Sequence, residues 1–309
     1  MKVIVGVDGS SNSLATVAFV GRLLAADRDL LVLAHVSPLV PFTGDDQLDP
    51  GVVSRAQNAL ASAVFDEAML RLPEEFQSRV ERREASGEPG AGLLRLADEV
   101  GAELIAVGSL GTAFFERFLL GSVSRAVVHS ARVSVLVVKT TGGRESEQLA
   151  GTADGTFRVL AAYDGSEFGA KIAAVAGRLS WPDSTRGWAL SVVPPMFHHQ
   201  VPSWMRPIQR DPDVQAMAEA WQKDFDQQLA ESVDDLKTFQ QTLPAPFQAT
   251  EPIVAQGNPA EQILATLTRQ KIDLAIVGSR GRGAVERLLV GSTSARVVNE
   301  ATCSVLIAR

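Results

Sequence analysis

The chain has 309 residues, which predicts two domains at about 150 residues each. It is 46% hydrophobic and 21% charged, with 25 glycines and 15 prolines, and this composition excludes a collagen-like or wholly disordered chain. Residues 1–150 carry 14 basic and 19 acidic groups, and residues 151–309 carry 15 and 17, so neither half resembles a nucleic-acid or anionic-membrane binder. The chain has one cysteine and no apolar run long enough to span a bilayer, and its N-terminal segment reaches Asp8 too early for a secretory signal. Together these features predict a cytoplasmic protein.

The first half alternates between predicted strands and helices. The apolar run 3–7 ends at Asp8-Gly9, as a buried strand does, and Ser10 or Ser11 can cap a helix behind it. The segments that follow predict a strand, a long amphipathic stretch, a strand, a helix, a strand, a helix and a last strand: 30–36, 50–72, about 78–85, 90–100, 103–107, 122–130 and 133–138. This alternation predicts right-handed crossovers and a parallel sheet with helices on both faces.

The second half repeats the first. FRVLAAYDGS (157–166) resembles MKVIVGVDGS (1–10) at an offset of 156, and 281–309 aligns without gaps to 111–139 at an offset of 170, with 13 of 29 positions identical. The 14 extra residues lie between 195 and 256. The later segments expected in this half are 187–193, 211–240, 247–254, 259–270, 273–277, 292–300 and 304–308. Residues 140–156 are rich in Gly, Thr and Ser, so we expect domains at 1–140 and 157–309 and a linker at 141–156.

Both halves carry one glycine spacing after the fourth predicted strand: Gly, two residues, Gly, nine residues, Gly-Ser. Glycine lets backbone N–H groups approach an anion closely, and a helix N-terminus adds unpaired donors and the positive end of a dipole. In a doubly wound sheet these features meet the end of the first strand at the switch in strand order, where ligands bind. The spacing therefore predicts a phosphate-binding cleft in each half.

This glycine pattern, behind a leading strand that ends in Asp-Gly-Ser, resembles the ATP-binding class of universal stress proteins. The resemblance covers nearly the whole chain as a tandem pair of domains, and GNPAEQIL (257–264) is also similar to a family segment. It implies two α/β domains, each a doubly wound five-stranded parallel sheet of order 3-2-1-4-5, with ATP, with or without Mg²⁺, lying across the strand ends. It also implies a stress-response regulator whose nucleotide occupancy modulates conformation, assembly or the binding of a protein partner.

The resemblance assigns site residues to both halves. In the first half, Asp8 would face the ribose, the backbone of Val36 would meet adenine, Val107 and Gly108 would line the base and ribose region, and the phosphates would contact Gly111, Gly121, Ser122, Val123 and Ser124. The second-half counterparts are Asp164, Val192, Val277, Gly278, Gly281, Gly291, Ser292, Thr293 and Ser294. The second half keeps the family's Arg280, Arg282 and Gly283, where the first has Leu110, Thr112 and Ala113. We therefore expect tighter nucleotide binding in the second half.

Alternatives remain open from the sequence. The aspartates and glycines could serve turns without any ligand, which would leave a structural interaction module. A further alternative is a slow Mg-dependent ATP hydrolase of the adenine-nucleotide alpha-hydrolase-like group, with a metal near Asp8 or Asp164. Neither half has the Gly-Lys-Ser/Thr of a P-loop or a base–nucleophile pair, so we predict no catalytic residues and no metal ligands.

Two further features concern contacts between parts of the chain or with partners. Residues 194–212 contain five prolines, Phe197, Trp204 and two methionines, so we expect a lid on the second site or an arm onto a partner subunit. The apolar last strands, 133–138 and 304–308, would have open edges, which favours pairing of the two halves or a homodimer. The sequence leaves the choice open.

Overall fold

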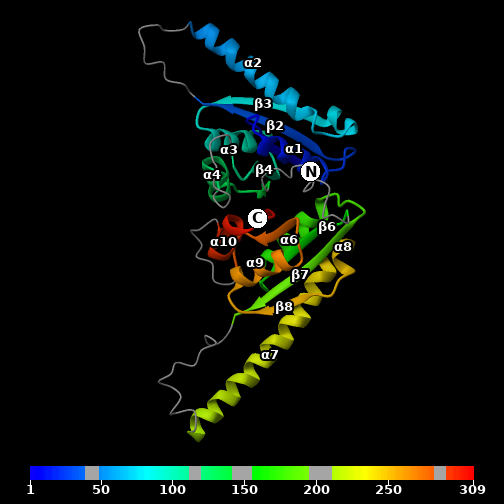
Figure 1. The fold of residues 1–309 in the computed structure, drawn as a ribbon, viewed down its shortest axis with the longest axis vertical. Helices are drawn as coiled ribbons and strands as arrows, with labels where there is room; N and C mark the ends of the chain where they lie inside the picture. The colour runs from blue at the N-terminus through cyan, green and yellow to red at the C-terminus, as the bar shows by residue number, and fades with distance from the viewer. Residues whose placement is uncertain (39–48, 111–119, 141–154, 195–210, 282–289) are drawn as a thin grey trace.

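The computed structural model describes residues 1–38, 49–110, 120–140, 155–194, 211–281 and 290–309. Its strands form one ten-stranded sheet in the order β3-β2-β1-β4-β5-β10-β9-β6-β7-β8 (Figure 1). Each half contributes five strands, and the pairs within a half are parallel. In both halves the order is 3-2-1-4-5, so the predicted doubly wound α/β fold is confirmed.

The elements of each half follow the predicted alternation closely. Those of the first half are β1 (Lys2–Gly6), α1 (Ser11–Gly21), β2 (Leu30–Ser37), α2 (Pro50–Met69), a 3-10 turn (Glu74–Arg79), β3 (Val80–Ser86), α3 (Pro89–Val100), β4 (Leu104–Gly108), α4 (Ser122–Ser130) and β5 (Ser134–Val138). Those of the second half are β6 (Phe157–Tyr163), α6 (Phe168–Arg178), β7 (Thr185–Val193), α7 (Pro212–Thr242), α8 (Ala245–Gln248), β8 (Ile253–Gln256), α9 (Pro259–Arg269), β9 (Leu274–Gly278), α10 (Ser292–Glu300) and β10 (Ser304–Ala308).

The third strand of the second half is shorter than predicted. The expected strand at 247–254 is wrong over its first part, because 245–248 form the short helix α8 and the strand begins only at Ile253. Prolines explain the difference: Pro246 suits the first turn of a helix, and Pro252 has no N–H to give to a strand ladder. Phe247 of α8 is fully buried, so this turn fills the core instead of extending the sheet.

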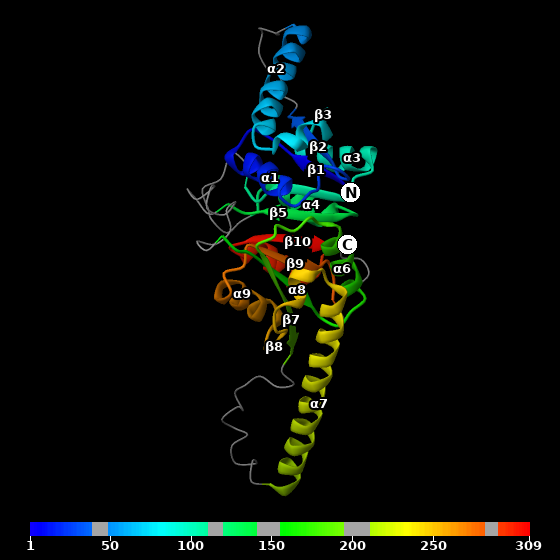
Figure 2. The ribbon, with the colours of Figure 1, turned by 90° about the vertical axis from the view of Figure 1, so that its right-hand side faces the viewer.

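The two halves join through their last strands. β5 and β10 pair antiparallel, with Leu136 opposite Leu306 (Figure 2). All five residues of each strand are buried, so the edge that each half would otherwise expose is covered by the other half. Because this pair is antiparallel, the parallel strands of one half run in the opposite direction to those of the other half. The carboxyl ends of the two sets, and with them the two predicted sites, therefore face in opposite directions along the strands.

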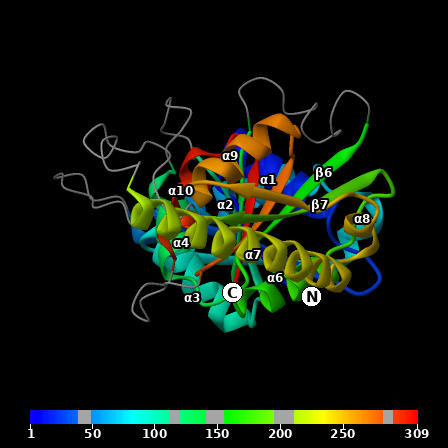
Figure 3. The ribbon, with the colours of Figure 1, turned by 90° about the horizontal axis from the view of Figure 1, so that it is seen from below.

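Helices cover both faces of the sheet. One core cluster contains side chains of α1, α2, α6, α7 and α8, and the other contains side chains of α3, α4, α9 and α10. Successive strand residues alternate between the clusters, as Val3 and Ile4 do. Helix α7 is the longest element; it packs on the sheet through buried Leu236 and Phe239 near its C-terminal end (Figure 3).

Candidate functional site

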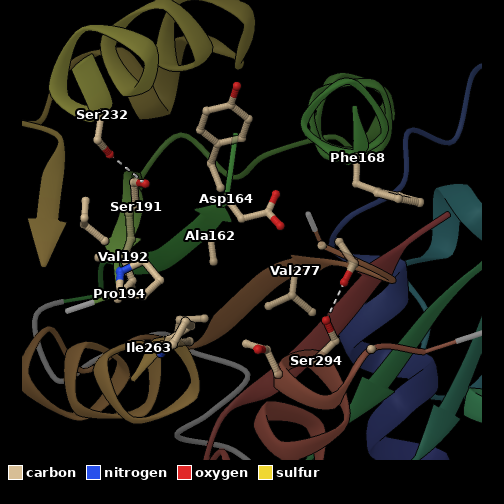
Figure 4. Close-up of a pocket in the computed structure, with 18 of the residues that line it drawn as sticks. Ala162, Asp164, Phe168, Ser191, Val192, Pro194, Ser232, Ile263, Val277 and Ser294 are labelled. Atoms are coloured by element: carbon tan, nitrogen blue, oxygen red, sulfur yellow. Dashed lines mark hydrogen bonds between the residues drawn. The ribbon is translucent and has the colours of Figure 1, made fainter. Parts of the chain in front are cut away.

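A cavity of about 790 Å³ opens at the switch point of the second half, between the ends of β6 and β9 (Figure 4). All nine second-half residues assigned from the sequence line it: Asp164, Val192, Val277, Gly278, Gly281, Gly291, Ser292, Thr293 and Ser294. They come from three strand ends and the start of α10, so the fold brings together positions up to 130 residues apart. The register explains part of this arrangement, because Ala162 of β6 lies beside Val277 of β9, which carries Asp164 to the glycine loop.

Asp164 closes the turn that leaves β6. Its Oδ1 accepts hydrogen bonds from the backbone N–H of Ser166 at 3.1 Å and from the Ser166 hydroxyl at 2.6 Å. Its Oδ2 lies against Gly281, where a Cβ atom would be only 2.4 Å away. One carboxylate oxygen thus supports the turn, and the other reaches the loop after β9, which only a glycine at 281 allows.

The N-terminus of α10 borders this cavity through Gly291, Ser292, Thr293 and Ser294. Gly291 is the N-cap residue and has no side chain, so the cap residue itself gives the first N–H groups of the helix no acceptor. The buried Ser294 hydroxyl donates instead to the carbonyl of Gly278 at 2.6 Å, which ties the helix start to the end of β9. An uncapped helix N-terminus flanked by glycines fits an anion such as a phosphate. Arg280 adds a cation to the same lining.

The opposite wall was missed by the sequence analysis. Helix α7 contributes Gln228, Glu231, Ser232 and Asp235, and the Ser232 hydroxyl lies 3.2 Å from that of Ser191 at the end of β7. The remaining lining is largely apolar: Tyr163, Phe168, Ile172, Leu190, Pro194, Pro259 and Ile263 are among its members. Residues 228, 231, 232 and 235 have the i, i+3, i+4, i+7 spacing of one helix face, a signal that could have identified this wall.

The first-half residues occupy equivalent places with different neighbours. Asp8 makes the same turn, accepting from the Ser10 N–H at 3.0 Å and the Ser10 hydroxyl at 2.5 Å, and Gly121 is again an N-cap without a side-chain bond. Val36 lies one residue before the end of β2, Val107 and Gly108 end β4, and Ser122, Val123 and Ser124 begin α4.

The helix above the first-half strand ends packs differently from α7. In α2, Val64 lies against Gly9, and the Phe65 ring lies edge-on to the His35 ring with the centroids 6.4 Å apart. The position equivalent to His35 in the second half is Ser191, which lines the cavity. The His35 ring nitrogen Nδ1 is also 2.8 Å from the carbonyl oxygen of Val7.

Some assigned positions lie outside the described residues: Gly111, Thr112, Ala113, Arg282, Gly283 and residues 195–210 of the lid or arm predicted at 194–212. The same holds for most of the expected linker. Within the described ranges, no three His, Cys, Asp or Glu side chains come close enough to hold a metal together. No helix in the described part of the chain has both the length and the apolar character of a membrane span.

The fold and the cavity define a class: a tandem, doubly wound α/β protein with an uncapped helix N-terminus at the switch point of its second half. Comparison with known proteins identifies the family. The model of the universal stress protein family matches residues 1–139 and 156–309, so the chain belongs to this family.

Two relatives agree with this assignment, and a solved structure has a similar fold. The chain is 30% identical to the universal stress protein Rv2623 of Mycobacterium tuberculosis, over 99% of this chain and 96% of that protein. It is 32% identical to Rv1636 of the same organism, over 45% of this chain and 96% of that protein. A universal stress protein from Archaeoglobus fulgidus has a similar fold, with a TM-score of 0.57 and 20% identity over 100% of this chain and 96% of that one.

Proposed function

We propose that this protein is a cytoplasmic, ATP-binding regulator of the stress response and that the second-half cavity is its principal nucleotide site. One observation carries the proposal: a single cavity combines an uncapped helix N-terminus, the glycines of the loop after β9, and Asp164 at the switch point. Its volume of about 790 Å³ falls in the range of small-molecule sites.

Each end of the cavity suits one part of ATP. The N–H groups at Ser292, Thr293 and Ser294, together with Arg280, would hold the phosphates. Asp164 would accept hydrogen bonds from the ribose hydroxyls, because an ionised carboxylate only accepts. The apolar residues at the ends of β7 and β9 would enclose the base.

Regulation requires that ATP bind two conformations with different affinities, because a ligand with equal affinity for both shifts nothing. The partner that reads the change would be another protein or a second copy. We further propose domain limits of 1–140 and 157–309, with a linker at 141–156.

Native mass spectrometry of the purified full chain, followed by calorimetric titration with ATP, tests the proposal. We expect bound adenine nucleotide, or stoichiometric binding after its removal. Gly291→Val should weaken binding more than Gly121→Val, because the second site is the principal one. No binding at millimolar ATP would overturn the function, and an equal or larger effect of Gly121→Val would overturn the ranking of the sites.

A further inference from the structure

Helix α2 is apolar on the side that faces away from the sheet. Five of its residues form this side, which we call the outer face of α2: Val52, Ala56, Ala59, Leu60 and Ala63. They have the spacing i, i+4, i+7, i+8 and i+11, which places them on one face of a helix. All five are exposed, Val52 by 43% and Leu60 by 66%. Residues 56–65 include no charged side chain, so the centre of the outer face is both exposed and uncharged.

The equivalent helix of the second half shows that the fold does not require an apolar outer face. Phe65 attaches α2 to the core as Leu236 attaches α7, and the two helices lie at opposite ends of the molecule (Figure 2). The side of α7 that faces away from the core carries four exposed charged residues: Glu219, Lys223, Asp234 and Lys237. An exposed apolar patch on only one of two equivalent helices is typical of a surface that binds another protein.

The outer face of α2 is complementary to itself. If two copies pack their α2 helices antiparallel about a twofold axis between Ala59 and Leu60, each Leu60 lies against Ala59 of the second copy. Ala56 then lies opposite Ala63 of the second copy. The large side chain meets a small one, and the alanines let the helix axes approach to about 8 Å. A twofold pair uses the same patch on both copies, so no further surface is needed to close the assembly.

The charges at the two ends of the outer face favour this antiparallel direction. Arg55 lies at the N-terminal end, and Asp66 and Glu67 lie at the C-terminal end. The Arg55 guanidinium reaches back along the helix, since its Nη1 is 3.3 Å from the position that a Cβ atom on Gly51 would have. Glu67 pairs with Arg71 at 3.0 Å and retains further acceptor sites. Antiparallel packing brings Arg55 of each copy to Glu67 of the other, whereas parallel packing would place like charges side by side.

We infer that the outer face of α2 is the surface through which two copies of this chain form an antiparallel dimer. The last strands are not open to a second copy, because β5 and β10 already pair within one chain. A helix of 20 residues is about 30 Å long, so one helix pair lies at the low end of the sizes of specific interfaces. We therefore expect a dimer that dissociates at micromolar concentrations. The dimer requires no bound nucleotide, so the inference and the proposed function can fail separately.

Sedimentation equilibrium of the full chain at about 1 to 300 µM measures the dissociation constant of the dimer. Leu60→Glu should raise this constant about a hundredfold or more, because one leucine of each copy loses its burial and two like charges meet near the axis. Ala230→Glu is the control, since it adds the same charge at an exposed position of α7, and it should change the constant by less than about twofold. Both substitutions lie at exposed helix positions, so the variants should fold, and circular dichroism and thermal melting check this.

Charge reversal tests the direction of packing. Arg55→Glu and Glu67→Arg should each weaken the dimer about tenfold, because each places like charges at both contacts. An equimolar mixture of the two variants should associate within about threefold of the wild type, since both contacts of the mixed dimer again join opposite charges. Failure of the mixture to associate overturns the antiparallel arrangement. A wild type that stays monomeric, or a Leu60→Glu variant that dimerises as tightly as Ala230→Glu, overturns the inference as a whole.

Discussion

Lys139 and Arg309 occupy equivalent positions after the last strands of the two halves, and each caps the final helix of the other half. The Lys139 ammonium donates to the carbonyls of Asn299 at 3.1 Å and Ala301 at 2.6 Å, at the end of α10. The Arg309 guanidinium donates to the carbonyls of Val128 and Ala131, at the end of α4. The last carbonyls of a helix lack internal partners and favour a cation, so this reciprocal exchange joins the halves in addition to the strand pairing.

The first prediction concerns the pH dependence of this seam. Burial lowers the pKa of Lys139 from 10.5 to about 8. Below pH 8 the amine is charged in both the folded and the unfolded chain, and folding bears the cost of burying the ammonium. Between pH 8 and 10.5 the unfolded chain binds a proton that the folded chain does not, so the free energy of unfolding rises with pH. The gain is at most about 3.5 kcal/mol, at about 1.4 kcal/mol per pH unit over the 2.5 units between the two pKa values.

Urea unfolding of the wild type and of Lys139→Met at pH 7.5, 9 and 10.5 measures this effect. The difference between the two proteins should grow in favour of the wild type as the pH rises. Burial raises the pKa of the neighbouring Cys303 thiol from 9.0 to about 12, so above pH 9 the unfolded chain loses a proton that the folded chain keeps, which lowers stability. Both proteins carry Cys303, so the comparison between them isolates the contribution of Lys139. Parallel pH profiles for the two proteins would show that Lys139 does not titrate in this range.

A second prediction concerns the aromatic contact between the halves. Phe157, at the start of β6, is 2% exposed, and its ring lies edge-on to Phe19 of α1 with the centroids 5.9 Å apart. Phe157→Ala should lower the free energy of unfolding by about 3–5 kcal/mol, because a large side chain leaves a cavity in the core. Leu70→Ala, at a residue that is 75% exposed, should change it by less than about 0.5 kcal/mol. Comparable losses in the two variants would argue against a tightly packed contact.

A third prediction separates the site from the stability of the fold. In Gly281→Ala the new Cβ would lie 2.4 Å from Asp164 Oδ2, so the carboxylate must turn away. The proposed hydrogen bond between Asp164 and a ribose hydroxyl would then be lost, so we expect the ATP affinity to fall by about tenfold, the value of one charge-assisted hydrogen bond. The melting temperature should change little. Gly177→Ala on α6 is the control, since nothing lies within 4 Å of its Cβ position. It should leave the affinity unchanged, and an equal loss of affinity in both variants would exclude the contact as the cause.

A fourth prediction concerns the attachment of α7. The buried Gln240 amide donates to the carbonyls of Phe247 at 2.6 Å and Thr250 at 2.8 Å. Gln240→Met keeps the volume but leaves two buried acceptors unpaired, which should cost about 2–3 kcal/mol of unfolding free energy. Gln241→Met, at the exposed neighbouring position, should cost little. Chemical denaturation of both variants distinguishes the two cases, and a stable Gln240→Met protein would mean that the hydrophobic contacts alone hold the helix.

The tandem repeat, the alternation of strands and helices, and the glycine spacing were all predictable from the sequence. These features are local: apolar periodicity, capping residues and turn chemistry act over a few residues, and an internal repeat is visible in the letters themselves. The resemblance to the universal stress protein family assigned the positions from Asp164 to Ser294 before their meeting in one cavity was known. They meet because parallel strands bring their carboxyl ends to the same side of the sheet.

The tertiary structure alone decided how the halves join and what covers the cavity. The antiparallel pairing of β5 with β10 and the exchange of caps by Lys139 and Arg309 depend on contacts between residues up to about 180 positions apart, which no local pattern encodes. The same holds for α7, whose sequence predicted an amphipathic stretch but not the strand ends that its polar face would meet. Packing of Leu236 and Phe239 against the sheet orients that face, and so brings Glu231 and Asp235 to the cavity.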